Sequence, residues 1–306
     1  MAPPSTARPE FIVGTSGYSF PDWVGTYYPA GTRPAQMLDF YARRFRALEP
    51  NFTFSGVPSA ATLDRMVRRT PPGFLFWVKA NQELTHKQNL SATEEFTESL
   101  APLASAGKLA GVLLQFPQSF HRTILSRRYL QEALSGVGRA LADLAEQAPA
   151  AAPAPAGLLL PLLPLPAPAP ATPPPATELA VEFRHESWNQ PSVVQALRER
   201  QVTLVVPDVP DLPGLYRPPP TATTSTGYLR LHSRNPAKWY RAADELSQPR
   251  RYDYDYSQPE LKELAQAWSR LDTPAERVYT FFNNCYGGQA GKNAEAFEKI
   301  VRELGA

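Results

Sequence analysis

Residues 179–188 read LAVEFRHESW, and within them polar side chains alternate with apolar ones. Residues 228–232, YLRLH, repeat this pattern further along the chain. Alternation with a period of two indicates a β-strand, because successive side chains of a strand point to opposite faces. The polar side chains that share one face of each segment are Glu182, Arg184, Arg230 and His232. Both segments therefore predict strands that are polar or charged on one face and apolar on the other.

Short apolar runs recur along the chain and are rich in Val, Phe, Leu and Tyr, as strands are. They lie at residues 11–16, 48–54, 74–80, 111–116, 179–184, 202–208, 228–232 and 277–283. Between most of them, apolar residues recur at helical spacing. These helical segments are 35–47, 59–69, 92–106, 125–146, 191–200, 259–271 and 290–304. The Pro-rich segment after Asp208 predicts a loop, so one helix is missing or very short.

Eight strands separated by crossover segments predict a parallel sheet. Eight units in about 275 residues, without the insertion described below, fit a closed (β/α)8 barrel of the TIM type, which typically needs ~250 residues. An open doubly wound sheet is the alternative. It is disfavoured because residues 14–17, GTSG, do not form a phosphate-binding glycine fingerprint after the first strand. We therefore predict an α/β TIM-type barrel that forms a single domain over residues 1–306.

An Ala/Pro-rich segment at residues 148–177 interrupts the pattern between the fourth and fifth βα units. Its composition predicts a semi-rigid, extended, solvated loop. The alternative is that its Leu cluster, residues 158–165, docks on the barrel or on another chain. Repeated prolines interrupt the apolar stretch and disfavour a membrane span, because proline removes backbone donors and blocks helix continuation.

The overall composition is that of an ordinary globular protein, with 43% hydrophobic and 20% charged residues. The net charge of +2, from 31 basic and 29 acidic residues, gives no reason to expect strong nonspecific nucleic-acid binding. A single cysteine, Cys285, excludes an intrachain disulfide and suits a reducing compartment. The first ten residues do not resemble a signal peptide, so we expect a cytoplasmic protein with no membrane partner.

Several blocks of the sequence resemble the YecE-like family, whose function is unknown. The blocks are VGTSGY at 13–18, EPNFTF at 49–54, FWVKA at 76–80, LQFP at 114–117, VEFRHESW at 181–188, YLRLH at 228–232 and FNNC at 282–285. The resemblance runs nearly the full length in the same order, and it implies a TIM-type barrel and the place of a site rather than a reaction. Ser55, Ser233 and the Ala/Pro insertion depart from the family pattern.

Polar residues lie where the predicted strands end, which is where barrels of this type carry their active sites. We predict that three of them are catalytic, namely His232, Glu182 and Asp208. The predicted substrate-binding residues are Glu49, Asn51, Lys79, His86, Arg184, Arg230, Asn283, Asn284, Gly287 and Gly288. Ionisable groups inside a barrel are costly unless they are paired, so the alternative is an ion-pair network that only fixes the structure.

An anion site is the favoured interpretation of this set. Lys79, Arg184 and Arg230 supply cations that suit phosphate or carboxylate. Gly287 and Gly288 precede the last helical segment, where backbone N–H groups approach ligands, although a simple tight turn is the alternative. A divalent metal such as Mg²⁺, Mn²⁺ or Zn²⁺ is a second interpretation, but the same cations would compete for the carboxylates. The metal candidates are Glu182, Asp208 and His232, with Glu49 joining from across the barrel.

Arg230 and His232 of the seventh predicted strand are expected to have different roles. Arg230 lies deeper and is expected to pair with Glu182 or Asp208 and hold it ionised. His232 lies nearer the mouth and is expected to exchange protons with substrate near neutral pH, with Glu182 as the other candidate base.

These residues predict an enzyme that acts on a phosphate-bearing substrate, such as a phosphodiester or a nucleic-acid end, and most simply hydrolyses a phosphate ester. One alternative is a non-catalytic module that binds nucleic acid or a phosphorylated metabolite. Basic and aromatic residues interleave at 233–241 and 250–256, which suits base stacking and phosphate pairing, or equally an exposed lid packed on the barrel rim. A sugar isomerase or hydrolase is the third interpretation. The sequence requires no cofactor.

Overall fold

The computed structural model describes residues 8–147, 177–240, 250–271 and 275–305. The Ala/Pro-rich segment therefore lies outside the described residues except for Thr177, as does Arg241 of the basic and aromatic loop. No helix within the described ranges is both long and apolar enough to cross a membrane.

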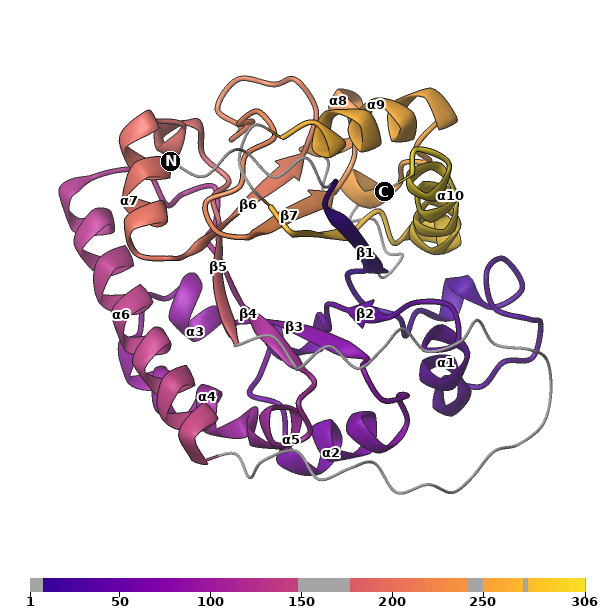
Figure 1. Ribbon diagram of the computed structural model, residues 1–306, viewed down its shortest axis with the longest axis horizontal. Helices are drawn as coiled ribbons and strands as arrows, with labels where there is room; N and C mark the ends of the chain where they lie inside the picture. Colours follow the sequence, from indigo (N-terminus) through magenta and orange to yellow (C-terminus); the bar gives the residue numbers. More distant parts are fainter. Residues whose placement is uncertain (1–7, 148–176, 241–249, 272–274, 306) are drawn as a thin grey trace.

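Eight parallel strands form a nearly closed barrel, as predicted (Figure 1). They are β1 (Glu10–Thr15), β2 (Ala47–Leu48), β3 (Leu75–Lys79), β4 (Leu109–Gln115), β5 (Glu178–Glu182), β6 (Thr203–Asp208), β7 (Thr226–Leu231) and β8 (Arg277–Phe282). Their order is β1-β8-β7-β6-β5-β4-β3-β2. An isolated parallel bridge between Ser16 and Glu49 joins β1 to β2. Gly14 permits this approach, because a Cβ there would lie 2.3 Å from the carbonyl oxygen of Ala47.

Helices surround the strands (Figure 1). They are α1 (Pro34–Tyr41), α2 (Ala60–Arg68), α3 (Gln82–Thr85), α4 (Thr93–Ser99), α5 (Ala101–Ser105), α6 (Ile124–Gln147), α7 (Pro191–Glu199), α8 (Pro236–Trp239), α9 (Gln258–Ser269) and α10 (Gln289–Glu303). Short 3₁₀ helices are η1 (Pro21–Trp23), η2 (Phe52–Phe54), η3 (Leu90–Ala92), η4 (Glu186–Trp188), η5 (Arg250–Tyr252) and η6 (Tyr286–Gly288). As expected, residues 209–225 between β6 and β7 contain no helix.

Three segments differ from the prediction, and proline accounts for two of them. The helix expected over residues 35–47 ends at Tyr41, and Ala47 begins β2. The second strand was expected to span residues 48–54, but it ends at Leu48 and residues 52–54 form η2. Pro50 carries no N–H and cannot continue a ladder. The helix expected over residues 92–106 is divided into α4 and α5, because Pro102 cannot donate within a continuous helix and is placed in the first turn of α5.

The strands bury different side chains on their two faces. A cluster inside the barrel consists of Ile12, Ala47, Trp77, Ala110, Leu113, Ala180, Val205, Tyr228, Tyr279 and Phe281. The alternate residues of β5 and β7 were expected to face the helices, and Val181, Phe183, Leu229 and Leu231 do lie in the outer core. Towards the C-terminal ends of the strands the inward positions become charged. The barrel interior is therefore apolar towards the N-terminal ends of the strands. It is polar at the mouth, where the strands have their C-terminal ends.

Candidate functional site

Arg230 is the centre of a buried ion network at the mouth, and its side chain is only 1% exposed. Its Nη2 lies 2.5 Å from Oε1 of Glu49, and its Nη1 donates to Oε2 of Glu182. The hydroxyl of Tyr228 donates to the other oxygen of Glu49 over 2.7 Å. The predicted deep pairing of Arg230 with Glu182 is thus present, and one guanidinium joins side chains that follow β2, end β5 and lie on β7.

Glu182 is held as a carboxylate by three neighbours. Nε of Arg184 lies 2.6 Å from its Oε1, and Nε2 of His232 lies 3.2 Å from the same oxygen. Burial by itself would raise the pKa of Glu182, but Arg184, Arg230 and the hydrogen bond from His232 hold that pKa well below its usual range. Glu182 is therefore a poor proton acceptor, and its role as a general base loses its physical support.

His232 is fully buried and its tautomer is fixed. The side-chain amide of Asn283 donates to Nδ1 over 2.8 Å, so Nε2 carries the hydrogen and donates to Glu182. Burial, and next the charge of Arg184, lower the pKa of His232 to about 3, although Glu182 acts in the opposite direction. These surroundings give no support to the expectation that His232 exchanges protons near neutral pH. The imidazole stays neutral because a further positive charge beside Arg184 and Arg230 in this buried cluster is unfavourable.

The pKa of Lys79 is lowered from the usual value for lysine into the neutral range. This lysine ends β3 and is partly exposed, and its Nζ lies 4.1 Å from the centre of the Phe54 ring. Within the described part of the chain this Nζ forms no hydrogen bond and no ion pair. Burial, and next the charges of Arg230 and Arg184, lower the pKa of Lys79 to about 7. The sequence identified Lys79 as a cation but contained no signal for this shift, which depends on distances across the barrel.

Two further predicted residues lie beside Lys79 at the mouth. The side chain of Arg184 is 11% exposed, and its terminal NH₂ groups have no hydrogen-bond partner among the residues that the structure describes. His86 packs its ring edge-on against Phe54, with 4.8 Å between ring centres. Burial, and next the charge of Lys79, lower the pKa of His86 to about 4, so it is neutral at pH 7. Among the described residues predicted for the site, Lys79 and Arg184 are therefore the accessible cations.

Asp208 does not join this cluster, contrary to the prediction. Val205 belongs to the barrel interior, so Asp208, three positions on, faces outward. Its carboxylate accepts hydrogen bonds from Arg234 at 2.9–3.1 Å and from the hydroxyl of Tyr256 at 2.7 Å. Burial raises its pKa, against the effect of Arg234.

The metal candidates are consequently separated. Glu182 and His232 are in contact inside the barrel, whereas Asp208 lies on the other face of the sheet. In the described ranges no group of three or more His, Cys, Asp or Glu side chains is arranged to hold a metal ion. The arrangement of the candidate ligands gives no support to the metal-site interpretation.

The glycine turn after β8 packs against another loop instead of facing the mouth. The N–H of Gly287 donates to the Asp22 carboxylate over 2.8 Å. Gly288 has a φ of +80°, and a Cβ there would lie 2.9 Å from the Thr26 hydroxyl oxygen. The alternative interpretation, a tight turn, is the one that these contacts support, and the predicted substrate-binding role of Gly287 and Gly288 has no support.

The two predicted asparagines that remain have structural partners. Asn51 donates to the carbonyl oxygen of Ser16 over 2.8 Å, which ties the loop after β2 to the end of β1. Asn284 faces away from the mouth, and its amide donates to the carbonyl of Tyr254 and to Asn293. Asn283, one residue earlier, faces inward and contacts His232. The single thiol, Cys285, is buried, and burial raises its pKa, so it is not an activated nucleophile.

The aromatic residues of the loops after β7 face largely inward. Trp239 is 3% exposed, and its ring lies 6.5 Å from that of His232. Tyr256 is also buried and bonds Asp208, while Lys238 forms an ion pair with Asp253. Tyr240 is the exposed aromatic of this described part, at 65%. These loops therefore act mainly as packing on the barrel rim, which disfavours their use as a stacking surface for bases.

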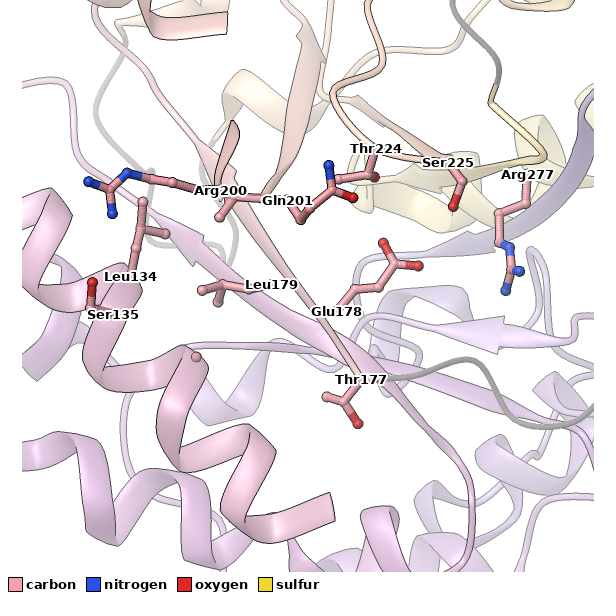
Figure 2. A pocket seen from close by; sticks show the side chains of 12 residues that line it. Leu134, Ser135, Thr177, Glu178, Leu179, Arg200, Gln201, Thr224, Ser225 and Arg277 are labelled. Atoms are coloured by element: carbon pink, nitrogen blue, oxygen red, sulfur yellow. The ribbon is translucent and has the colours of Figure 1, made fainter. Parts of the chain in front are cut away.

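A cavity of about 570 Å³ lies at the opposite end of the barrel, where strands begin (Figure 2). Figure 2 shows Leu134 and Ser135 of α6 on one side and Arg277 on the other. Glu178 lines this cavity, and its carboxylate accepts hydrogen bonds from the hydroxyls of Thr203 and Thr226. The cavity is separate from Lys79 and Arg184. Since TIM-type barrels carry their chemistry at the C-terminal ends of strands, the mouth remains the candidate site.

Comparison with known proteins identifies one family over nearly the whole chain. A family model described as "Protein of unknown function DUF72" matches residues 12–305. The YecE-like name is another label for this family, although the matches do not carry it. The UPF0759 protein YunF of Bacillus subtilis (strain 168) is 26% identical over 304 residues, covering 94% of each chain.

Solved structures of the same family have the same fold. The DUF72 family protein TM1631 of Thermotoga maritima MSB8 is 35% identical, with a TM-score of 0.75 over 96% of this chain and 99% of the other. The DUF72 family protein EF0366 of Enterococcus faecalis V583 is 25% identical, with a TM-score of 0.72 over 95% of both chains.

Proposed function

This chain belongs to the DUF72 family of proteins of unknown function, and we propose that it is an enzyme that binds a small phosphate-bearing substrate at the barrel mouth. The observation that carries this proposal is the pair of accessible cations, Lys79 and Arg184, above a network whose carboxylates are already occupied. An anion between the two cations would supply the negative charge that Lys79 lacks.

The charge balance of the mouth favours an anion. Three cationic side chains, Lys79, Arg184 and Arg230, face two carboxylates, those of Glu49 and Glu182. Arg230 donates hydrogen bonds to both carboxylates. The positive charge that is left over therefore lies on Lys79 and Arg184, which are partly exposed. The planar guanidinium of Arg184 suits two oxygens of a phosphate, and Lys79 adds a point charge.

Lys79 is also the best-placed proton acceptor. With a pKa of about 7, a large fraction of its side chain is a neutral amine at physiological pH, and general bases are most effective near that pH. Glu182 then acts as a positioning residue because it pairs with Nε of Arg184, and His232 acts through its hydrogen bond to Glu182. Hydrolysis of a phosphate ester stays a prediction, with Lys79 in place of His232 as the base.

Anion binding can be measured directly. Isothermal titration with inorganic phosphate and a small phosphomonoester should show one site in the wild-type protein. Lys79→Met and Arg184→Met should each weaken binding at least tenfold, because each removes one of the two accessible charges. Lys87→Met, which removes an exposed lysine paired with Glu83, should leave binding unchanged. Binding should strengthen as the pH falls through 7, since Lys79 then becomes charged.

Equal phosphate affinity in Lys79→Met and in the wild type would contradict this proposal. A nucleic-acid-binding module would instead bind oligonucleotides with a steep dependence on salt concentration, because phosphate-backbone contacts release counterions. We expect no such dependence for the phosphomonoester beyond ordinary charge screening.

A further inference from the structure

The surroundings of the Lys79 amine are unusual for a lysine at a barrel mouth. Its Nζ contacts the face of Phe54, and no carboxylate of the described residues lies within 4.0 Å of it. Most partly buried lysines keep their charge by pairing with a carboxylate. Here the nearby carboxylates, Glu49 and Glu182, are engaged by Arg230 and Arg184 instead.

The groups that face this amine come from several strands. Arg230 and Arg184 act on it as positive charges, and Glu182 and Glu49 as more weakly acting negative ones. His86, on the segment after β3, is neutral and packs edge-on against Phe54. A lysine that is desolvated beside other cations is the recognised environment of an amine that attacks carbonyl groups, since the neutral, nucleophilic form is then populated at neutral pH.

We propose that Lys79 is a covalent nucleophile, which forms an imine with an aldehyde or ketone group of the substrate while Arg184 holds the phosphate or carboxylate of the same molecule. This inference rests on the proposed anion site and adds a substrate class to it: a small carbonyl compound that carries an anionic group.

The step is balanced without an oxidant or reductant. The lone pair of neutral Nζ forms a bond to the carbonyl carbon, and the π electrons of the carbonyl move to its oxygen. That oxygen takes a proton from solvent and the nitrogen loses one, which gives a carbinolamine. The nitrogen lone pair then forms the C=N bond as the protonated hydroxyl leaves as water. Amine, carbonyl and one proton thus give an iminium ion and water.

The iminium ion carries the same single positive charge as the ammonium form of Lys79, and the negative charges of Glu182 and Glu49 act in its favour. Electrons from a bond next to the former carbonyl carbon can move towards this cation, so the class of chemistry it supports is cleavage or proton removal at that neighbouring carbon.

Reductive trapping tests the inference on the full-length protein. Glyceraldehyde 3-phosphate and pyruvate serve as anionic probes and acetone as an uncharged one, each with sodium cyanoborohydride at pH 7, followed by peptide mass spectrometry. We expect Lys79 to be modified by the anionic probes at least tenfold faster than exposed Lys87. Lys79→Arg should abolish this fast modification and keep the charge, with its melting temperature measured as a check on folding.

Arg184→Met separates the covalent step from anion recognition. It should slow modification of Lys79 by the anionic probes at least tenfold and change modification by acetone by less than twofold. Adducts spread evenly over the exposed lysines would overturn the inference. Phosphate binding that persists without any adduct at Lys79 would remove the inference and leave the proposed anion site intact. Fast modification of Lys79 by all three probes, without phosphate binding, would instead remove the anion site and leave the nucleophile.

Discussion

Two clusters of arginine, carboxylate and tyrosine lie on opposite faces of the same barrel wall. Inside, Arg230 joins Glu49 and Glu182, and Tyr228 completes the set; the side chains of the three ionised residues are at most 1% exposed. Outside β6, Arg234 and Tyr256 hold Asp208, and this arginine is 23% exposed. The residue types are the same, but access to water differs.

This difference in access to water distinguishes the inner cluster, which belongs to the candidate site, from the outer cluster, which is structural. The outer cluster satisfies one carboxylate with one arginine, and Arg234 also reaches Glu263 at the surface. The inner cluster sets three cationic side chains, Lys79, Arg184 and Arg230, against the carboxylates of Glu49 and Glu182, so one positive charge is left over for a ligand. Burial makes the inner pairing costly to lose and makes its surplus charge attractive to an anion.

The strongest test of the comparison removes the inner arginine. Arg230→Met leaves Glu49 and Glu182 buried without the arginine that they share, and breaking buried pairs in this way costs about 3–5 kcal/mol. Urea unfolding should show this loss in the free energy of unfolding. Arg302→Met, at an exposed arginine paired with Glu298, should change that free energy by less than about 0.5 kcal/mol.

Removal of the outer arginine should have a smaller effect. In Arg234→Met the carboxylate of Asp208 keeps the Tyr256 hydroxyl and can reach water, so the loss should be about 1–2 kcal/mol by the same urea measurement. Equal losses for Arg230→Met and Arg234→Met would mean that burial does not distinguish the two clusters.

A pH experiment sharpens the comparison further. The pKa of His232 is lowered to about 3 in the folded protein, so between pH 6.5 and 3 the unfolded chain binds a proton that the folded chain does not. Stability therefore falls as the pH falls, by about 1.5 kcal/mol between pH 6.5 and 5. His232→Gln should remove this contribution to the slope and leave the contribution of His86, whose pKa is lowered to about 4. An unchanged slope in His232→Gln would show that His232 is charged in the folded state.

The barrel could be predicted from the sequence because its strands are individually well marked. In residues 181–184 alternation identifies both faces, and the inward positions of Glu182 and Arg184 followed directly. Asp208 was assigned to the wrong face because β6 is apolar at nearly every position before it. Such a strand carries no alternation that would show which way its last residue points, and only the inward position of Val205 places Asp208 on the outer face.

The chemistry of the mouth could be predicted from the sequence only in part. The spacing of Arg230 and His232 showed that they share a face, but not that Trp239 and Tyr252 lie over the imidazole. The behaviour of Lys79 depends on two arginines that follow it by more than 100 positions in the chain. A shift of this kind arises only when the barrel brings separate strands together.

The double attachment of Arg230 has a consequence for the order of folding. It connects side chains that are 181 and 48 residues away along the chain, so its contacts close only when strands from both halves of the barrel are already in place. Interactions that form this late are absent from the folding transition state and present in the native state, and they therefore slow unfolding more than they speed folding. We therefore expect the contacts of Arg230 to affect the unfolding rate of the barrel more than its folding rate.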